Sequence, residues 1–279
     1  MGLMLLVVVC YTICSLSDKY SVAKLKMEGN AFTFLMAGPT AILLLFMLPF
    51  SDTHFIMSWQ AVLAIVLVAT VKLLEFRLAT VILREMSAFE LKAWLGLTLF
   101  FSYATDIFIG TNDFHIIKII TIIVTAVGLF MIAKSENGHI NYKKIAIPLF
   151  FYLLAKYGYG MIMTTAKPYV SSFLALLFGL ILLAIVLIPF AKPVTLFKTK
   201  FKGSMFVALT KIPNAIGLVL ENMVIAISMT NYSFIQPMIM VTLFFIGIIR
   251  KESTKPLNII GGIICIIGIL GFQLVDILK

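Results

Sequence analysis

The sequence predicts an all-α integral membrane protein whose ten transmembrane helices form two inverted five-helix repeats. The composition is the first reason, because 62% of the 279 residues are hydrophobic, 12% are charged, and the mean hydropathy is +1.11. A soluble domain carries about a quarter charged residues. The second reason is that the apolar residues form runs of the length that a helix needs to cross a bilayer. The third is that the second half of the chain repeats the pattern of the first.

Ten apolar runs, separated by charged and turn-forming segments, give the expected helices. In chain order they cover residues 3–23, 31–50, 59–83, 88–109, 116–133, 145–166, 169–190, 204–228, 231–249 and 256–276. The runs are continuously apolar and lack the alternation of transmembrane β-strands, so we expect helices that satisfy their own backbone hydrogen bonds in lipid. The first run has no basic segment before it and no small-residue cleavage site, which predicts a retained helix rather than a signal peptide.

The two halves of the chain match each other. Residues 1–134 form the first expected repeat, residues 135–144 a polar hinge, and residues 145–279 the second repeat. Short motifs recur in the same order about 140 residues apart: LPF at 48–50 and IPF at 188–190, VATVK at 68–72 and VALTK at 207–211, TLFF at 98–101 and 242–245. Because each repeat has an odd number of helices, the second enters the membrane from the opposite side. Inverted repeats are typical of alternating-access transporters, whose solute site lies at the repeat interface.

Loop charges predict the orientation. Thirteen basic residues lie after the odd-numbered runs: Lys24, Lys26, Arg84, Lys134, Lys143, Lys144, Lys192, Lys198, Lys200, Lys202, Arg250, Lys251 and Lys255. The opposite side holds Lys118, Lys167 and Lys279. By the positive-inside rule the side with thirteen faces the cytoplasm, so both termini are expected outside.

The remaining composition points to partners. A net charge of +10 suggests nucleic acid in a soluble protein, but here the basic residues cluster at helix ends, so no nucleic-acid partner is expected. Cys10, Cys14 and Cys265 lie inside apolar runs without metal-ligand spacing and are expected to be packing residues. We expect no metal and no cofactor, a small-molecule solute and membrane lipid as partners, and a monomer or homodimer.

Charged residues inside the apolar runs predict the site. A charge at the bilayer centre costs about 2.5–3.5 kcal/mol or more, which makes each one a candidate functional residue. Ten lie well inside the runs: Asp18, Lys19, Lys72, Glu75, Arg77, Glu90, Lys92, Lys156, Lys211 and Glu221. They fall on the first, third, fourth, sixth and eighth runs, which are therefore expected to line a water-filled cavity. The second, fifth, seventh and tenth runs are expected to form an apolar outer set.

The paired lysines Lys72 and Lys211 indicate the solute. They occupy equivalent positions in the two repeats, and two cations in a low dielectric attract an anionic or zwitterionic solute. Helical spacing and repeat matches extend the predicted substrate-binding set to Lys72, Lys211, Asn214, Lys92, Gln236, Lys156, Tyr159 and Tyr11. The alternative is that each lysine pairs with a nearby acid, Glu75 or Glu221, and stabilises the bundle. Glu75, Glu221 and Glu90 are candidates for ion pairing or for carrying a coupling proton.

A motif in the second half carries a resemblance to a known family. The stretch YSFIQPM at 232–238, followed by FIGIIRKES at 245–253 and by Gly261, Gly262 and Gly268, resembles the drug/metabolite transporter superfamily, EamA-like. The first half departs from that pattern: Ala93 replaces the proline, and Asp106 or Asp113 stands where a glutamate is expected. The resemblance implies a ten-helix transporter. Well-known eukaryotic members keep both termini in the cytoplasm, whereas the loop charges here place them outside.

Together these observations predict a secondary transporter of the cell membrane, not an enzyme, which moves a small polar anionic or zwitterionic metabolite by alternating access. A membrane-embedded enzyme is the main alternative, but His54, His115 and His139 fall in loops or at their edges and no HExxH motif is present. A lipid-translocating protein is a further alternative. The KYGYG stretch at 156–160 is similar to a potassium filter, yet it lies mid-run and in one half only.

Overall fold

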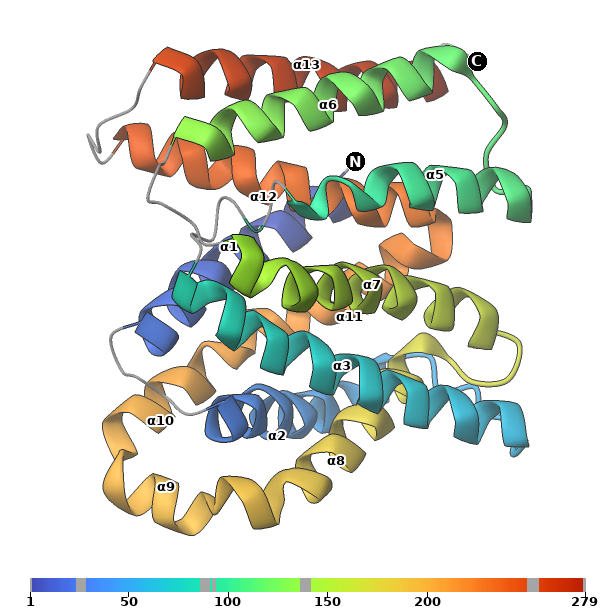
Figure 1. The fold of residues 1–279 in the computed structure, drawn as a ribbon. Coiled ribbons are helices and arrows are strands. Elements are labelled where there is room, and N and C mark those ends of the chain that lie inside the picture. Colours follow the sequence, from blue (N-terminus) through green and yellow to red (C-terminus); the bar gives the residue numbers. More distant parts are fainter. Residues whose placement is uncertain are drawn as a thin grey trace.

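The protein is built from helices, as the sequence predicts (Figure 1). The computed structural model describes residues 2–23, 29–85, 91, 94–135, 142–249 and 256–277. The elements are α1 Gly2–Ala23, α2 Gly29–Met47 with a 3₁₀ turn Leu48–Phe50, α3 Trp59–Glu85, α5 Thr98–Ile109, α6 Ile116–Ser135, α7 Tyr142–Ala166, α8 Ser172–Ala191, α9 Pro193–Thr199, α10 Phe201–Leu209, α11 Lys211–Ile227, α12 Met229–Ile249 and α13 Pro256–Ile277. Within these residues the only β-type pairing is an isolated bridge between Phe55 and Val170.

Length and surface both fit a membrane protein. Within the described residues, five segments are long and apolar enough to cross a membrane: Gly29–Phe50, Lys144–Ala166, Ser172–Ala191, Phe201–Ile227 and Met229–Ile246. Large apolar side chains such as Phe46, Phe108 and Ile147 are 74%, 93% and 70% exposed. Soluble proteins rarely expose apolar surface on this scale. The outer surface of the bundle is therefore suited to lipid.

Two expected helices are interrupted. In the run 88–109 a turn at residues 96–97 precedes α5, which begins at Thr98. The run 204–228 is broken at Thr210 into α10 and α11, and the short helix α9 precedes them where the sequence predicts a loop. Pro213 fits the break, because it has no N–H to bond the carbonyl of Leu209 and lies in the first turn of α11, where that bond is not needed. The break makes Lys211 the first residue of α11. Most of the predicted hinge 135–144 lies outside the described residues.

The helices pack mainly in pairs drawn from the two halves of the chain. In Figure 1, α6 runs beside α13, α5 beside α12, and α2 beside α8, while α1 packs on α11 and α3 on α7. The α6–α13 pair is close because it uses glycine: a Cβ on Gly128 would lie 2.5 Å from the backbone nitrogen of Cys265. Such small-residue contacts let helix backbones approach in a membrane. The helices α1, α3, α7 and α11 are left to surround the interior.

The bundle has two distinct ends. At one of them the segments 51–58 and 167–171 meet, where the backbone N–H of Ile56 donates to the carbonyl of Tyr169 at 2.8 Å. We call this the bridged end. At the opposite end α1 and α3 finish and α2 and α7 begin, and Lys144 of α7 pairs with Glu85 of α3. We call it the basic end, because Arg84, Lys144 and the lysines between α8 and α10 lie there.

Candidate functional site

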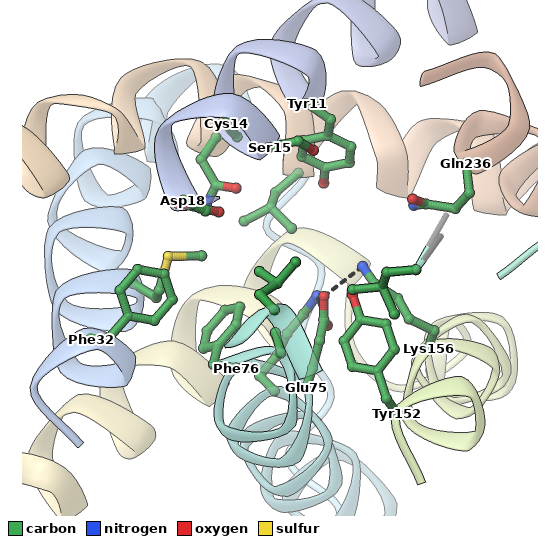
Figure 2. Close-up of a pocket in the computed structure, with 17 residues that line it drawn as sticks. Tyr11, Cys14, Ser15, Asp18, Phe32, Glu75, Phe76, Tyr152, Lys156 and Gln236 are labelled. Atoms are coloured by element: carbon green, nitrogen blue, oxygen red, sulfur yellow. Dashed lines mark hydrogen bonds and ion pairs between the residues drawn. The ribbon is translucent and has the colours of Figure 1, made fainter. Parts of the chain in front are cut away.

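A polar cavity lies in the middle of the bundle, between α1, α2, α3, α7, α11 and α12 (Figure 2). About 110 Å³ of it is open to the centre of a water-sized molecule, which is room for several waters or a small polar solute. Its polar lining residues are Tyr11, Ser15, Asp18, Lys72, Glu75, Tyr152, Lys156, Asn214 and Gln236. Phe32, Phe76 and Leu83 extend the lining toward the basic end.

Glu75 sits between two lysines in the cavity wall. Its Oε2 lies 2.9 Å from Nζ of Lys72, one helical turn away on α3, and its Oε1 lies 2.5 Å from Nζ of Lys156 on α7. The ammonium group of Lys72 also lies 3.8 Å from the centre of the Tyr159 ring, which is a cation–π contact. Two ammonium groups thus share one carboxylate, and the cluster keeps an excess of positive charge.

Lys211 lies behind the cavity wall rather than on it. Its Nζ pairs with Oδ1 of Asp18 on α1 at 2.9 Å; the Lys211 side chain is fully buried, while that of Asp18 is 18% exposed and lines the cavity. Of the alternative pairings, Lys72 with Glu75 is present, whereas Lys211 pairs with Asp18 and not with Glu221. Lys211 and Glu221 are ten positions apart on α11, which is about 15 Å along the helix axis.

Glu221 has a different partner. The Tyr11 hydroxyl of α1 donates to its Oε2 at 2.5 Å, and its Oε1 has no hydrogen-bond partner among the described residues. The residue is completely buried. Next to it, the hydroxyl of Tyr159 on α7 donates to Oδ1 of Asn222 at 2.7 Å. We call Tyr11, Tyr159, Glu221 and Asn222 the barrier layer.

A second hollow lies beyond the barrier layer, at the bridged end. About 180 Å³ of it is open to the centre of a water-sized molecule, and Asp106, Met163, Thr164, Lys167 and residues 225–229 are among its lining. Along α7 the lining passes from Tyr152 and Lys156 in the central cavity to Met163 and Thr164 in the second hollow, with Tyr159 between them. The order along α11 is the same, with Glu221 and Asn222 in the middle.

The predicted site residues fall into three groups. Six line the cavity: Tyr11, Lys72, Glu75, Lys156, Asn214 and Gln236. Lys211, Tyr159 and Glu221 are buried and contact lining residues. Lys92 and Glu90 lie outside the described residues. Thus nine of the eleven are described, and all nine belong to the cavity wall or to the layer behind it.

The assignment of α2 to an apolar outer set is incomplete. One face of α2 carries large exposed apolar residues, but Phe32 and Met36 on its other face line the cavity. An apolar side chain can wall a polar cavity, so counting charges does not detect it. Asp18, one of the ten charged residues inside the apolar runs, also lines the cavity. Tyr152 lines it too, and could have been found as a polar residue on a predicted inner helix.

A second buried polar cluster, centred on Asp106 of α5, was not predicted as a site. Its Oδ1 accepts from the Thr111 hydroxyl and the Met229 N–H. Its Oδ2 accepts from the Asn112 amide, the Ser228 hydroxyl, and both the N–H and the hydroxyl of Thr230. The carboxylate therefore caps the N-terminus of α12, where backbone N–H groups lack helical partners.

Lys118 of α6 belongs to the same cluster. Its position in the sequence groups it with the loop charges, yet Lys118 is 1% exposed and donates to Oδ1 of Asn112 at 2.8 Å. Its Nζ also lies 4.9 Å from the centre of the Phe272 ring on α13. Its place near the start of an apolar run gave no signal of burial. The described residues include no group of three or more His, Cys, Asp or Glu placed to hold a metal ion.

Comparison with known proteins adds no assignment, because no family model and no curated protein matches the chain. The resemblance to the drug/metabolite transporter superfamily therefore stays a prediction.

Proposed function

We propose that this protein is a multi-pass secondary transporter of the cell membrane that moves a small polar metabolite, anionic or zwitterionic, by alternating access. The observation that carries the proposal is the barrier layer, a thin set of side chains between the central polar cavity and the second hollow at the bridged end. A binding protein or an enzyme needs one hollow. A carrier needs one on each side of a barrier that can open and close.

The barrier layer is suited to reversible opening. It closes through hydrogen bonds between side chains of different helices: Tyr159 of α7 with Asn222 of α11, and Tyr11 of α1 with Glu221 of α11. A net contribution of about 1 kcal/mol for each neutral hydrogen bond is small enough for helix movements to break and remake it. The central cavity extends toward the basic end, which the loop charges place in the cytoplasm. In this conformation the cavity faces inward.

Helix pairing supports the two-repeat architecture. If residues 1–134 and 145–279 are equivalent, a two-fold axis in the membrane exchanges their helices in order. The pairs α2–α8, α5–α12 and α6–α13 then map onto themselves, and α1–α11 maps onto α7–α3. Lys211 with Asp18 maps onto Lys72 with Tyr159, and both are contacts of a lysine with a residue on the partner helix. Inverted repeats of this kind bind solute at their interface.

The charges indicate which solutes fit. Lys72 and Lys156 share the carboxylate of Glu75, so a carboxylate or phosphate group of a solute can take one of the two ammonium groups as its own partner. Asp18, which is partly exposed to the cavity, can accept a hydrogen bond from the ammonium group of a zwitterion. A simple cation meets two lysines at the centre of the cavity and is repelled.

The test is a solute panel on purified protein. Carboxylates, phosphate esters, amino acids and polyamines are screened for thermal stabilisation, and the stabilising solutes are then tested for flux into liposomes. A ligand at 100 times its dissociation constant adds about 2.7 kcal/mol to stability. We expect anions or zwitterions to stabilise the protein, Lys72→Met to abolish stabilisation and flux, and the exposed-lysine control Lys144→Met to retain both. Stabilisation by polyamines alone, or solute turnover without flux, contradicts the proposal.

A further inference from the structure

We propose that Glu221 is a proton-binding site and that the transporter carries one proton together with one monoanionic solute. This inference rests on the proposed transport function, because it names the ion that is coupled to the solute. Its starting point is the environment of the Glu221 carboxyl group, which differs from that of the other buried acids.

Glu221 is buried without a cation. Its relative exposure is 0%, its Oε1 is unpartnered, and its Oε2 accepts only from the neutral hydroxyl of Tyr11, all among the described residues. Asp18 and Glu75, by contrast, each form an ion pair with a lysine, and no such pair is formed by Glu221 in the described part of the chain. Burying an ionised carboxylate without a paired charge is costly, and protonation removes that cost. The site is therefore built to hold a proton.

The charged and titratable neighbours of Glu221 come from the helices that pack against it. On α1 these are Tyr11 and Asp18, and Asp18 is engaged with Lys211. Tyr152, Lys156 and Tyr159 of α7 and Tyr232 of α12 lie within electrostatic range. The described parts of α2 and α8 contain no titratable residue. Lys156 has its own carboxylate partner in Glu75, so no cation among the described neighbours is reserved for Glu221.

Tyr11 connects this site to the cavity. Its ring lines the cavity, and its hydroxyl is bonded to Glu221. A proton can therefore reach Glu221 in one concerted step: a hydronium ion in the cavity gives a proton to the Tyr11 hydroxyl oxygen, the original O–H bond of Tyr11 breaks, and a new O–H bond forms on Oε2 of Glu221. Tyr11 is neutral before and after the step. The net change is one proton moved from the cavity to the carboxylate.

The balance of buried charge explains why the proton and the anion move together. Three buried lysines, Lys72, Lys156 and Lys211, face the acids Asp18 and Glu75 and the carboxyl group of Glu221. With Glu221 ionised the set has no net charge. With Glu221 protonated it has one positive charge, which one monoanion cancels. The carrier is thus neutral when it holds both proton and anion and when it holds neither, whereas the proton-loaded carrier without its anion must rearrange around a net charge in low dielectric.

Infrared difference spectroscopy of the purified full-length protein tests the proton site directly, with the proton itself as the probe. We expect the wild type at neutral pH to show the carbonyl-stretch band of a protonated carboxylic acid, and Glu221→Gln to lose it. The matched control Glu85→Gln changes an acid in a surface ion pair and keeps the band. Tyr11→Phe keeps the band but moves it, because the carboxyl group loses the one hydrogen bond that it forms within the described part of the chain. A wild-type spectrum without a band that depends on Glu221 overturns the proposal.

Flux measurements separate this inference from the proposed function. For any panel metabolite that wild-type proteoliposomes take up, an inwardly directed proton gradient drives accumulation, and Glu221→Gln abolishes that drive while retaining downhill exchange. Flux that is indifferent to the proton gradient overturns proton coupling and leaves the transporter proposal in place. A Glu221 band without flux of any panel metabolite retains the proton site and overturns the transport function on which coupling depends.

Discussion

The two buried polar regions of this protein differ in how completely their acids are satisfied. At the bridged end both oxygens of Asp106 are filled by hydrogen-bond donors from α12 and from the turn after α5. In the centre Glu75 is shared by two lysines, and Glu221 has one hydrogen-bond partner among the described residues, which leaves its Oε1 unpartnered there. A satisfied carboxylate fixes two helices relative to each other. An incompletely satisfied one next to open volume leaves bonds to be made by a solute or a proton.

The largest loss of stability is expected when Asp106, the fully hydrogen-bonded acid, is replaced. Asp106→Ala leaves two backbone N–H groups at the start of α12 and several buried side-chain donors without a partner. Each buried orphan costs about 1–3 kcal/mol, so we expect most of the folded protein to be lost. Thermal unfolding in detergent measures the loss of stability. The surface control is Glu85→Gln, which we expect to change stability by no more than about 1 kcal/mol. An unfolding temperature equal to that of the control contradicts a fixing role.

Lys211→Met has the next largest effect on stability. It leaves the Asp18 carboxylate without its cation, and breaking a buried pair by removing one partner costs about 3–5 kcal/mol. Because Asp18 is 18% exposed and can take up water, we expect a value at the lower end. Denaturant or thermal unfolding measures the change, and the double variant with Asp18→Asn should recover part of it. Equal stability of Lys211→Met and wild type shows that the pair contributes nothing.

Lys72→Met makes the same chemical change as Lys211→Met, but on the cavity wall. Glu75 keeps Lys156 as a partner at 2.5 Å, so the stability loss should be about 1 kcal/mol, the size of one hydrogen bond. Solute binding, measured by thermal stabilisation and liposome flux, should be abolished. If Lys72→Met unfolds the protein as strongly as Lys211→Met, the two lysines share a structural role and the division between them is wrong.

An effect on stability of the same small size is expected in the barrier layer. Tyr159→Phe removes the hydroxyl that closes on Asn222 and should cost about 1 kcal/mol. The same loss has a large effect on the equilibrium between the closed and the open barrier, because a change of 1.4 kcal/mol shifts a two-state equilibrium about tenfold. Hydrogen exchange of the α7 and α11 amides next to the barrier should become faster in this variant and stay unchanged in the exposed control Lys144→Met. Unchanged exchange at those amides contradicts a barrier held by this bond.

The sequence allows the helical class and most helix bounds to be predicted, because apolar runs of membrane length have one structural solution. It also identifies Lys72, Glu75 and Lys156, since a charge inside an apolar run must face the interior. Other features depend on tertiary packing. Pro213 marks a possible break before Lys211, but the partner of Lys211 depends on how α11 packs. Because α11 packs on α1, that partner is Asp18. Phe32 and Lys118 carry no signal, because neither their type nor their spacing distinguishes cavity or core from lipid and loop.

The central claim is that the barrier layer opens and closes, and Cys14 on the cavity wall provides the most direct measurement. With Cys10 and Cys265 replaced by Ala, a membrane-impermeant thiol reagent is applied separately to the two sides of oriented vesicles. We expect Cys14 to react from the side of the basic end. Tyr159→Phe should raise the rate of Cys14 modification from the bridged side and lower it from the basic side. Reaction that rises from both sides together indicates an open pore, and reaction that never occurs from the bridged side contradicts alternating access.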